Sequence, residues 1–145
     1  MKIELRVEGC LVRGGKLLLV NHVRERESYW VLPGGHVEPL EMLQETLGRE
    51  LLEELGLEVN VGPLVLVHQT LLEERHTVNF TFVVSGFDVK QLKLVPGKRL
   101  RDCRWVSAEE IPALDVRPPL GEVLQGFARG EFPGKIEVHT FGRGE

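Results

Sequence analysis

Apolar and polar residues alternate at the start of the chain, as they do in a β-strand that has one exposed face. Every second residue over positions 3–7 is apolar and the residues between them are charged, which is the period-two pattern of a strand. The strand is predicted to continue through residues 10–13, after which Gly14-Gly15 indicates a two-residue hairpin turn. Residues 16–20 are almost wholly apolar, so we expect the returning strand to be more deeply buried.

The period changes from two to that of an α-helix in the stretch that ends at Leu57. At about 100° per residue, five leucines lie in one continuous sector that borders Glu54; they are Leu43, Leu47, Leu51, Leu52 and Leu55. Such a stripe predicts a helix that packs its leucines on a sheet. Pro33-Gly34-Gly35 indicates a tight turn before the helix, and Gly56 is placed to end it in a left-handed conformation.

The rest of the chain shows the same two periods. Strands are predicted over residues 58–72, with a bend at Gly62-Pro63, over 78–84 and 102–106, and, as an edge strand or a tail, over 135–141. Helices are predicted after a capping box at residues 107–110 and over residues 120–129. The charged residues 24–28 and the segment 87–101, which contains Pro96-Gly97, are predicted to be loops.

Three glutamates gather on one side of the predicted helix. Glu50, Glu53 and Glu54 fall within a sector about 100° wide, and like charges four residues apart destabilise a helix. Carboxylates in the last turns also lie at the negative end of the helix dipole. A hard divalent cation bound through oxygen ligands would offset both penalties. Glu41, Glu45 and Arg49 form a separate row at intervals of four residues. We expect this row to hold Arg49 in place and to keep it from neutralising the ligands.

A longer pattern around these glutamates is typical of one family. The chain resembles the Nudix box at every defining position: Gly35, five residues, Glu41, seven residues, and Arg49-Glu50-Leu51-x-Glu53-Glu54-x-Gly56-Leu57. A chance match of this pattern in such a chain is on the order of one in ten million. The flanking residues 30–34 and 104–107 also resemble the family. The chain departs from it at Leu40, where many members have glycine, and at Thr46, where many have alanine.

The resemblance implies an α+β fold, in which a mixed β-sheet is sandwiched between α-helices. It also implies a divalent metal, Mg²⁺ or Mn²⁺, and hydrolysis of a pyrophosphate bond in a nucleoside diphosphate linked to another moiety. The implied ligands are Glu50 and Glu54, with Glu53 as ligand or base and the Gly34 carbonyl completing the shell. Arg49 would orient Glu50. Metal ions would neutralise phosphate charge and acidify a water, whose remaining proton a carboxylate takes.

Contacts with the substrate are expected outside the glutamates. Arg24 and Arg26 either belong to a loop that is simply solvated, or one of them meets a substrate phosphate, because this loop runs directly into the Pro-Gly-Gly turn. Trp30 is either a core residue or a platform on which a base stacks, and Gly35 allows the backbone to approach a ligand closely. Phe82, on the strand predicted at residues 78–84, is a further candidate.

The family's distal carboxylate is less well matched. Many members have a glutamate some residues before the tryptophan that corresponds to Trp105. The nearby residues here are Lys98, Arg99 and Asp102. Asp102 is the best substitute, and we expect it to face the glutamate helix across the substrate pocket.

Composition limits the remaining possibilities. The 145 residues suit one domain, with a core over about 3–130 and a C-terminal strand or tail over 131–145. A net charge of −4 argues against an extended nucleic-acid surface, so the expected partner is a small nucleotide. No apolar run approaches the ~18 residues of a membrane helix, and no signal-peptide pattern opens the chain. Cys10 and Cys103 are expected to be reduced thiols. We expect the protein to be cytoplasmic, to be a monomer or a homodimer, and to make no contact with a membrane.

Three functions are consistent with this sequence. The first is a metal-dependent Nudix hydrolase, and the second is a nucleotide-binding regulator on the same fold that lacks catalysis. The third is an interaction protein whose acidic helix is purely structural. The intact set of three glutamates favours the first. Within it, substrates of the ADP-ribose, nucleoside triphosphate and dinucleoside polyphosphate types all remain open.

Overall fold

The computed structural model of the chain describes residues 2–95 and 100–142. Its strands are β1 (Ile3–Arg13), β2 (Lys16–Arg24), β3 (Glu27–Val31), β4 (Gly34–His36), β5 (Asn60–Leu72), β6 (Arg75–Ser85), β7 (Leu100–Ser107) and β8 (Val138–Gly142). The α-helices are α1 (Leu43–Leu55) and α2 (Gly121–Ala128), and the short 3-10 helices are η1 (Val89–Gln91) and η2 (Ile111–Ala113). None of the helices in these two ranges is long and apolar enough to cross a membrane.

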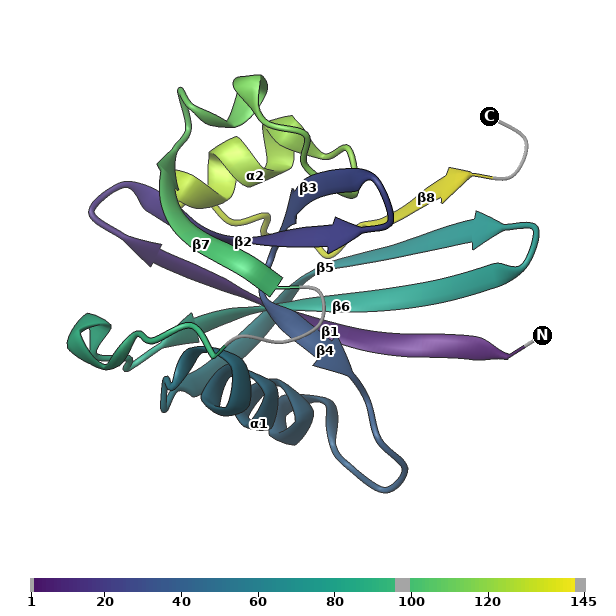
Figure 1. Ribbon diagram of the computed structural model, residues 1–145, viewed down its shortest axis with the longest axis horizontal. Coiled ribbons are helices and arrows are strands. Elements are labelled where there is room, and N and C mark those ends of the chain that lie inside the picture. The colour runs from purple at the N-terminus through teal and green to yellow at the C-terminus, as the bar shows by residue number, and fades with distance from the viewer. Residues whose placement is uncertain (1, 96–99, 143–145) are drawn as a thin grey trace.

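Both parts of the sheet are built from β1. This strand runs parallel to β6 and antiparallel to β4, and its last residues pair with β2. β5 lies antiparallel to β6, β8 adds parallel to β5, and β3 and β7 each pair antiparallel with β2. Figure 1 shows α1 on one side of the strands and α2 on the other. The predicted α+β fold with a mixed sheet between helices is therefore confirmed.

Two hydrophobic cores lie on the two faces of β1. Because side chains alternate along a strand, Val7 packs in the core under α1, whereas Cys10 packs in the core beside α2. Leu51 of α1 and Phe127 of α2 are almost completely buried in these two cores. Each helix is thus fixed to the opposite face of the same strand, and this fixes the position of the glutamates of α1 relative to β1.

Most of the predicted elements are present. The Gly14-Gly15 turn joins β1 to β2, and both glycines have positive φ, at 57° and 74°. The helix predicted over 120–129 is α2, and the segment 135–141 contributes the edge strand β8 rather than a tail. The predicted loop at 87–101 holds η1 and the start of β7, and its Pro96-Gly97 lies outside the described residues.

The prediction that residues 24–28 form a charged loop is wrong. β2 and β3 form a hairpin in which only Glu25-Arg26 makes the turn, and Val23 already pairs with Ser28. The charged side chains belong to strand ends, where exposed positions tolerate charge. The hairpin brings Arg24 toward the same cavity as polar residues of β1.

Two helix predictions need correction. The Ser107 amide donates to Glu110 Oε1 at 3.1 Å, as in a capping box. Only the 3-10 turn η2 follows, because Pro112 has no amide with which to extend a helix. In α1, Leu52 is 50% exposed. It stands at the far edge of the predicted leucine sector, beyond the reach of the sheet.

Candidate active site

Two glycines allow the strand β4 to lie tightly between β1 and α1. Gly34 and Gly35 pair with Glu8 and Val7 of β1. A Cβ atom at Gly34 would overlap the Val7 carbonyl oxygen, and one at Gly35 would overlap the carboxyl group of Glu50. The predicted close approach at Gly35 is therefore made first by a side chain of the protein itself.

Arg49 is held by carboxylates on two sides. Its Nε and Nη2 donate to Glu41 at 2.8 and 3.0 Å, and its Nη1 donates to Glu50 Oε1 at 3.0 Å and to Glu53 Oε2 at 3.2 Å. These hydrogen bonds from Arg49 lower the pKa of Glu41 to about 2. A bidentate contact of this kind fixes the plane of the guanidinium, so Arg49 is positioned to orient Glu50.

The expected row of Glu41, Glu45 and Arg49 is wrong in two respects. Arg49 is not kept away from Glu50, and Glu41 precedes α1 instead of lying on it. Glu45 caps the helix, since its Oε1 accepts a hydrogen bond from the Met42 amide at 2.9 Å. Caps of this type satisfy amide groups that the first turn leaves free.

Glu50 and Glu54 lie one helical turn apart, near β4. The Glu50 side chain is 15% exposed, whereas that of Glu53 is 58% exposed, and Glu54 forms no salt bridge with any residue in the described ranges. Burial, together with repulsion from Glu50 and a hydrogen bond with it, raises the pKa of Glu54 to about 8, against a smaller opposing effect of Arg6. Without a cation, the pair therefore retains a proton at neutral pH.

The donor set fits a hard divalent cation. No group of three His, Cys, Asp or Glu side chains is already assembled for a metal within the described residues. Mg²⁺, however, is usually bound by one or two carboxylates together with waters and substrate phosphates. Two adjacent carboxylates without a protein cation on Glu54 match that requirement, and Gly34 is close by in β4.

A cavity of about 590 Å³ lies on the face of β1 that points away from α1, and the box glutamates are not part of its lining. Its lining includes Leu32, which directly precedes the Pro-Gly-Gly turn, and Arg6, whose charge acts on Glu54. Strands β1, β6 and β5 provide one wall through the face that points away from α1, and the β2–β3 hairpin and residues 117–119 contribute the others. The volume is in the range of small-molecule sites.

Glu8 and His68 form a buried pair in the sheet wall of this cavity. His68 Nε2 lies 2.6 Å from Glu8 Oε1, and the Thr81 hydroxyl donates to the same oxygen at 2.6 Å. Burial alone would raise the pKa of Glu8, but the charge and hydrogen bond of His68 and the bond from Thr81 outweigh it and lower the pKa. Glu8 therefore remains ionised inside the protein.

The predicted substrate residues are not all brought together. Arg24 lines the cavity, whereas Arg26 stands exposed in the hairpin turn and is not part of its lining. Trp30 is partly buried against the α2 core, with the Arg104 guanidinium 5.7 Å from its ring centre. Phe82 is 3% exposed in the core under α1, because it has the opposite parity on β6 from the residues that face the cavity.

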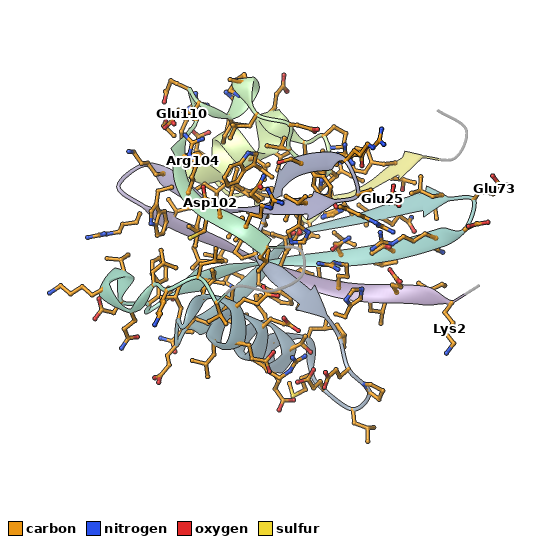
Figure 2. The ribbon with its side chains drawn as sticks, in the orientation of Figure 1. Lys2, Glu25, Glu73, Asp102, Arg104 and Glu110 are labelled. Carbon is orange, nitrogen blue, oxygen red and sulfur yellow. The ribbon has the colours of Figure 1, made fainter. Side chains whose placement is uncertain are left out.

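The structure also leaves Asp102 apart from the glutamates. Its neighbours Cys103 and Trp105 pack against the core under α1, so alternation along β7 turns Asp102 to the other face. Figure 2 shows Asp102 and Arg104 on β7, above α1 in that view and nearer to α2. The carboxylate of Asp102 accepts a hydrogen bond from the Cys103 amide at 2.8 Å.

Sequence reasoning missed the polar wall of the cavity. Arg6, Glu8, His68 and Asn79 line it, although the polar face of the first strand was expected to be exposed to solvent and no cavity was predicted there. The available signal was the alternation of charged residues at the start of β1. Only the pairing of β1 with β6 and of β6 with β5 shows that this face is enclosed.

The mixed sheet between two helices and the arrangement of Arg49 and the glutamates on α1 agree with the family that the sequence resembles, whose members are hydrolases of pyrophosphate bonds. The chain matches the NUDIX domain family over residues 5–127 and therefore belongs to the Nudix family. Among its relatives, the phosphatase NudJ of Escherichia coli (strain K12) is 33% identical over 131 residues, which cover 84% of this chain and 82% of that protein.

Solved structures agree on the fold. The solution structure of the E. coli ORF135 protein superimposes with a TM-score of 0.73 at 31% identity, covering 88% of this chain and 89% of the other. The crystal structure of a MutT protein from Methanosarcina mazei Go1 gives a TM-score of 0.72 at 26% identity, covering 88% and 94%. The predicted family, fold class and enzymatic character are thus confirmed.

Proposed function

We propose that this Nudix hydrolase uses a divalent cation to cleave the pyrophosphate bond of a nucleoside diphosphate linked to another moiety, by attack of water at phosphorus. The observation that carries the proposal is the pair Glu50 and Glu54, which are close together and partly buried. Such a pair is costly unless a cation is added. Cys10 and Cys103 are free thiols, which supports action in the cytoplasm.

Bound Mg²⁺, or Mn²⁺ in its place, would be held by Glu50, Glu54 and the Gly34 carbonyl, and would supply phosphate charge neutralisation and a more acidic water. Arg49 fixes the orientation of Glu50 through the contacts described above. Glu53 is the exposed member of the set and can accept the proton of the attacking water. Arg6 and Arg24, both in the lining of the cavity, can bind the phosphates that extend from the site.

The two alternative functions predict different surroundings for Glu54. A structural acidic helix would pair this carboxylate with a protein cation, and none of the described residues forms a salt bridge with it. A catalytically idle regulator would not need to keep three glutamates on this helix, two of which, Glu50 and Glu53, are held by Arg49. Both features favour hydrolysis.

The test is a panel of ADP-ribose, nucleoside triphosphates and dinucleoside polyphosphates, assayed for pyrophosphate cleavage with Mg²⁺, with Mn²⁺ and with EDTA. We expect cleavage of at least one class, abolished by EDTA and restored by either metal. Nucleotide binding without turnover on every class would overturn the proposal and select the regulator.

A further inference from the structure

The sheet wall of the cavity holds an unusual concentration of buried polar groups. Of the seven buried polar or charged side chains in the described ranges, five lie on the cavity face of β1, β6 and β5: Glu8, His68, Thr77, Asn79 and Thr81. Burying polar groups is costly unless hydrogen bonds satisfy them. A cavity wall this polar therefore indicates recognition of a ligand.

Hydrogen-bonding capacity on this wall is only partly used by the protein. Glu8 Oε1 accepts from both His68 and Thr81, but its Oε2 has no partner among the described residues, and neither does the side-chain amide of Asn79. His68 Nδ1 is the only fully enclosed side-chain polar atom in those ranges that lacks a partner. Glu8 Oε2 and the Asn79 amide thus retain access to the cavity, which both residues line.

The two groups are near neighbours on one face. Glu8 is in register with Thr81 of β6, and Asn79 stands two residues earlier on β6, on the same face. Diagonal neighbours of this kind are about 7–8 Å apart at their Cα atoms, within reach of one planar ring for side chains of this length. A ligand edge that carries one donor and one acceptor can therefore contact both.

Given the proposed hydrolase function, on which this step rests, we infer that Glu8 and Asn79 select a substrate whose head group is an amino-substituted nitrogen heterocycle. The exocyclic amino group donates to Glu8 Oε2, and the adjacent ring nitrogen accepts from the Asn79 amide. Glu8 is a specificity-determining residue in this arrangement, held by His68 and Thr81.

The choice of an amino over an oxo substituent follows from the acceptor-only character of a carboxylate. The amide of Asn79 can rotate to match either a donor or an acceptor, but an ionised carboxylate can only accept. An oxo group in the same place would turn a carbonyl oxygen toward a buried anion. Sites built to hydrogen-bond a substrate group reject analogues that lack it, because their own polar groups are then left unpaired.

The test is calorimetric binding of nucleoside monophosphates to the full chain in EDTA, where no hydrolysis can intervene. CMP with UMP and AMP with IMP are pairs that differ in an amino or oxo group, in a pyrimidine and a purine respectively. In at least one pair we expect about tenfold tighter binding of the amino member, and that pair identifies the ring type. A ratio below threefold in both pairs would overturn the inference.

The variants separate Glu8 from general charge effects. Glu8→Gln should bring the preferred pair's ratio below threefold, whereas Glu4→Gln, the same change on the same strand at a half-exposed ion pair with Arg75, should leave it intact. A ratio unchanged in Glu8→Gln would contradict the inference. If circular dichroism shows that Glu8→Gln does not fold, Asn79→Leu takes its place, with the same expected loss and the same contrary result.

The binding ratio is independent of turnover. Glu50→Gln should retain the amino preference while cleavage is lost. Absence of cleavage in the wild-type chain would therefore count against the proposed hydrolysis, and absence of the amino preference would count against the present inference.

Discussion

Two carboxylates, one on β1 and one on the helix α1 that packs against β1, have pKa values shifted in opposite directions. Glu8, in the cavity wall, receives hydrogen bonds from His68 and Thr81, and its pKa is lowered despite burial. Glu54, on α1, has Glu50 as its close neighbour and no salt-bridge partner in the described ranges, and its pKa is raised to about 8. Hydrogen bonds from the protein thus stabilise the charge of Glu8, whereas no salt bridge within the described residues stabilises a charge on Glu54.

The difference distinguishes a buried carboxylate that hydrogen bonds from the protein stabilise from a carboxylate that forms no salt bridge. A buried carboxylate whose one oxygen is held by two hydrogen bonds has a fixed orientation, and its other oxygen can recognise a fixed ligand edge. A carboxylate pair in which only Glu50 has a salt bridge, to Arg49, is unfavourable when both members are ionised, so cation binding to the pair is stabilising. The same residue type therefore serves recognition in one region and metal binding in the other.

Removing a charge from the Glu50–Glu54 pair should have the largest effect on function. Glu50→Gln is expected to lower the rate of pyrophosphate cleavage on the order of 100-fold or more, because charge neutralisation and water activation depend on it. Steady-state kinetics in Mg²⁺ would measure this. Glu45→Gln is the matched control, since it lies on the same helix and its amide oxygen can still cap Met42. Equal losses in both variants would contradict the assignment.

Breaking the hydrogen bonds of Glu8 with His68 and Thr81 should instead lower the free energy of unfolding. His68→Ala would leave Glu8 buried without its hydrogen-bonded partner, and loss of one member of a buried pair costs about 3–5 kcal/mol. Chemical denaturation would show this as a lower midpoint. His139→Ala, on the neighbouring strand in register with His68, should change stability by no more than about 0.5 kcal/mol. A similarly small effect of His68→Ala would remove the contrast between the two regions.

The two carboxylates should also act in opposite directions on the pH dependence of stability. The folded-state pKa of Glu54 lies above its ordinary value of 4.5, so its contribution is complete below that value and is lost as pH rises through about 8. The pKa of Glu8 is lowered, so its contribution is present above 4.5 and is lost as pH falls through its folded-state pKa.

Thermal melts in EDTA can isolate the two contributions. Glu54→Gln should remove the decline in melting temperature between mildly acidic and mildly alkaline pH, and it should leave the loss at acidic pH in place. A decline that persists unchanged in this variant would show that Glu54 does not cause it.

A smaller prediction tests whether backbone strain, rather than charge, destabilises the region of the box. Leu40 has φ of 67° and is fully exposed, a conformation that favours glycine. Leu40→Gly should raise the free energy of unfolding by about 0.5–1 kcal/mol, without changing its pH dependence. A change in the pH dependence would mean that the loop and the carboxylates are coupled.

The helix and its glutamates could be predicted because the information is local. The period of 100° per residue placed Leu47, Leu51 and Leu55 on the buried side, and the spacing of the box residues named the carboxylates. The helical period gave a wrong prediction at Leu52, because the sector assumed to be buried was wider than the contact with the sheet. It also failed for Arg49, because the wheel describes angles around the axis and not the reach of a long side chain.

The cavity could not be predicted because its wall is assembled from distant segments. His68 and Thr81 follow Glu8 by 60 and 73 residues, and their contact depends on β6 lying parallel to β1. No local period specifies that pairing. The parity of a strand relative to its neighbours likewise decides that Phe82 packs under α1 and that Asp102 turns away from it.

The most direct test of the account is the response of Glu54 to a cation. Melting temperatures of the wild-type chain and Glu54→Gln would be measured in EDTA and in excess Mg²⁺, with cleavage rates from the same preparations. We predict that Glu54→Gln is at least as stable as wild type in EDTA, gains much less stability from Mg²⁺, and has lost most of its cleavage activity. A variant that is less stable in EDTA but cleaves normally in Mg²⁺ would contradict the assignment of the Glu50–Glu54 pair as the metal site.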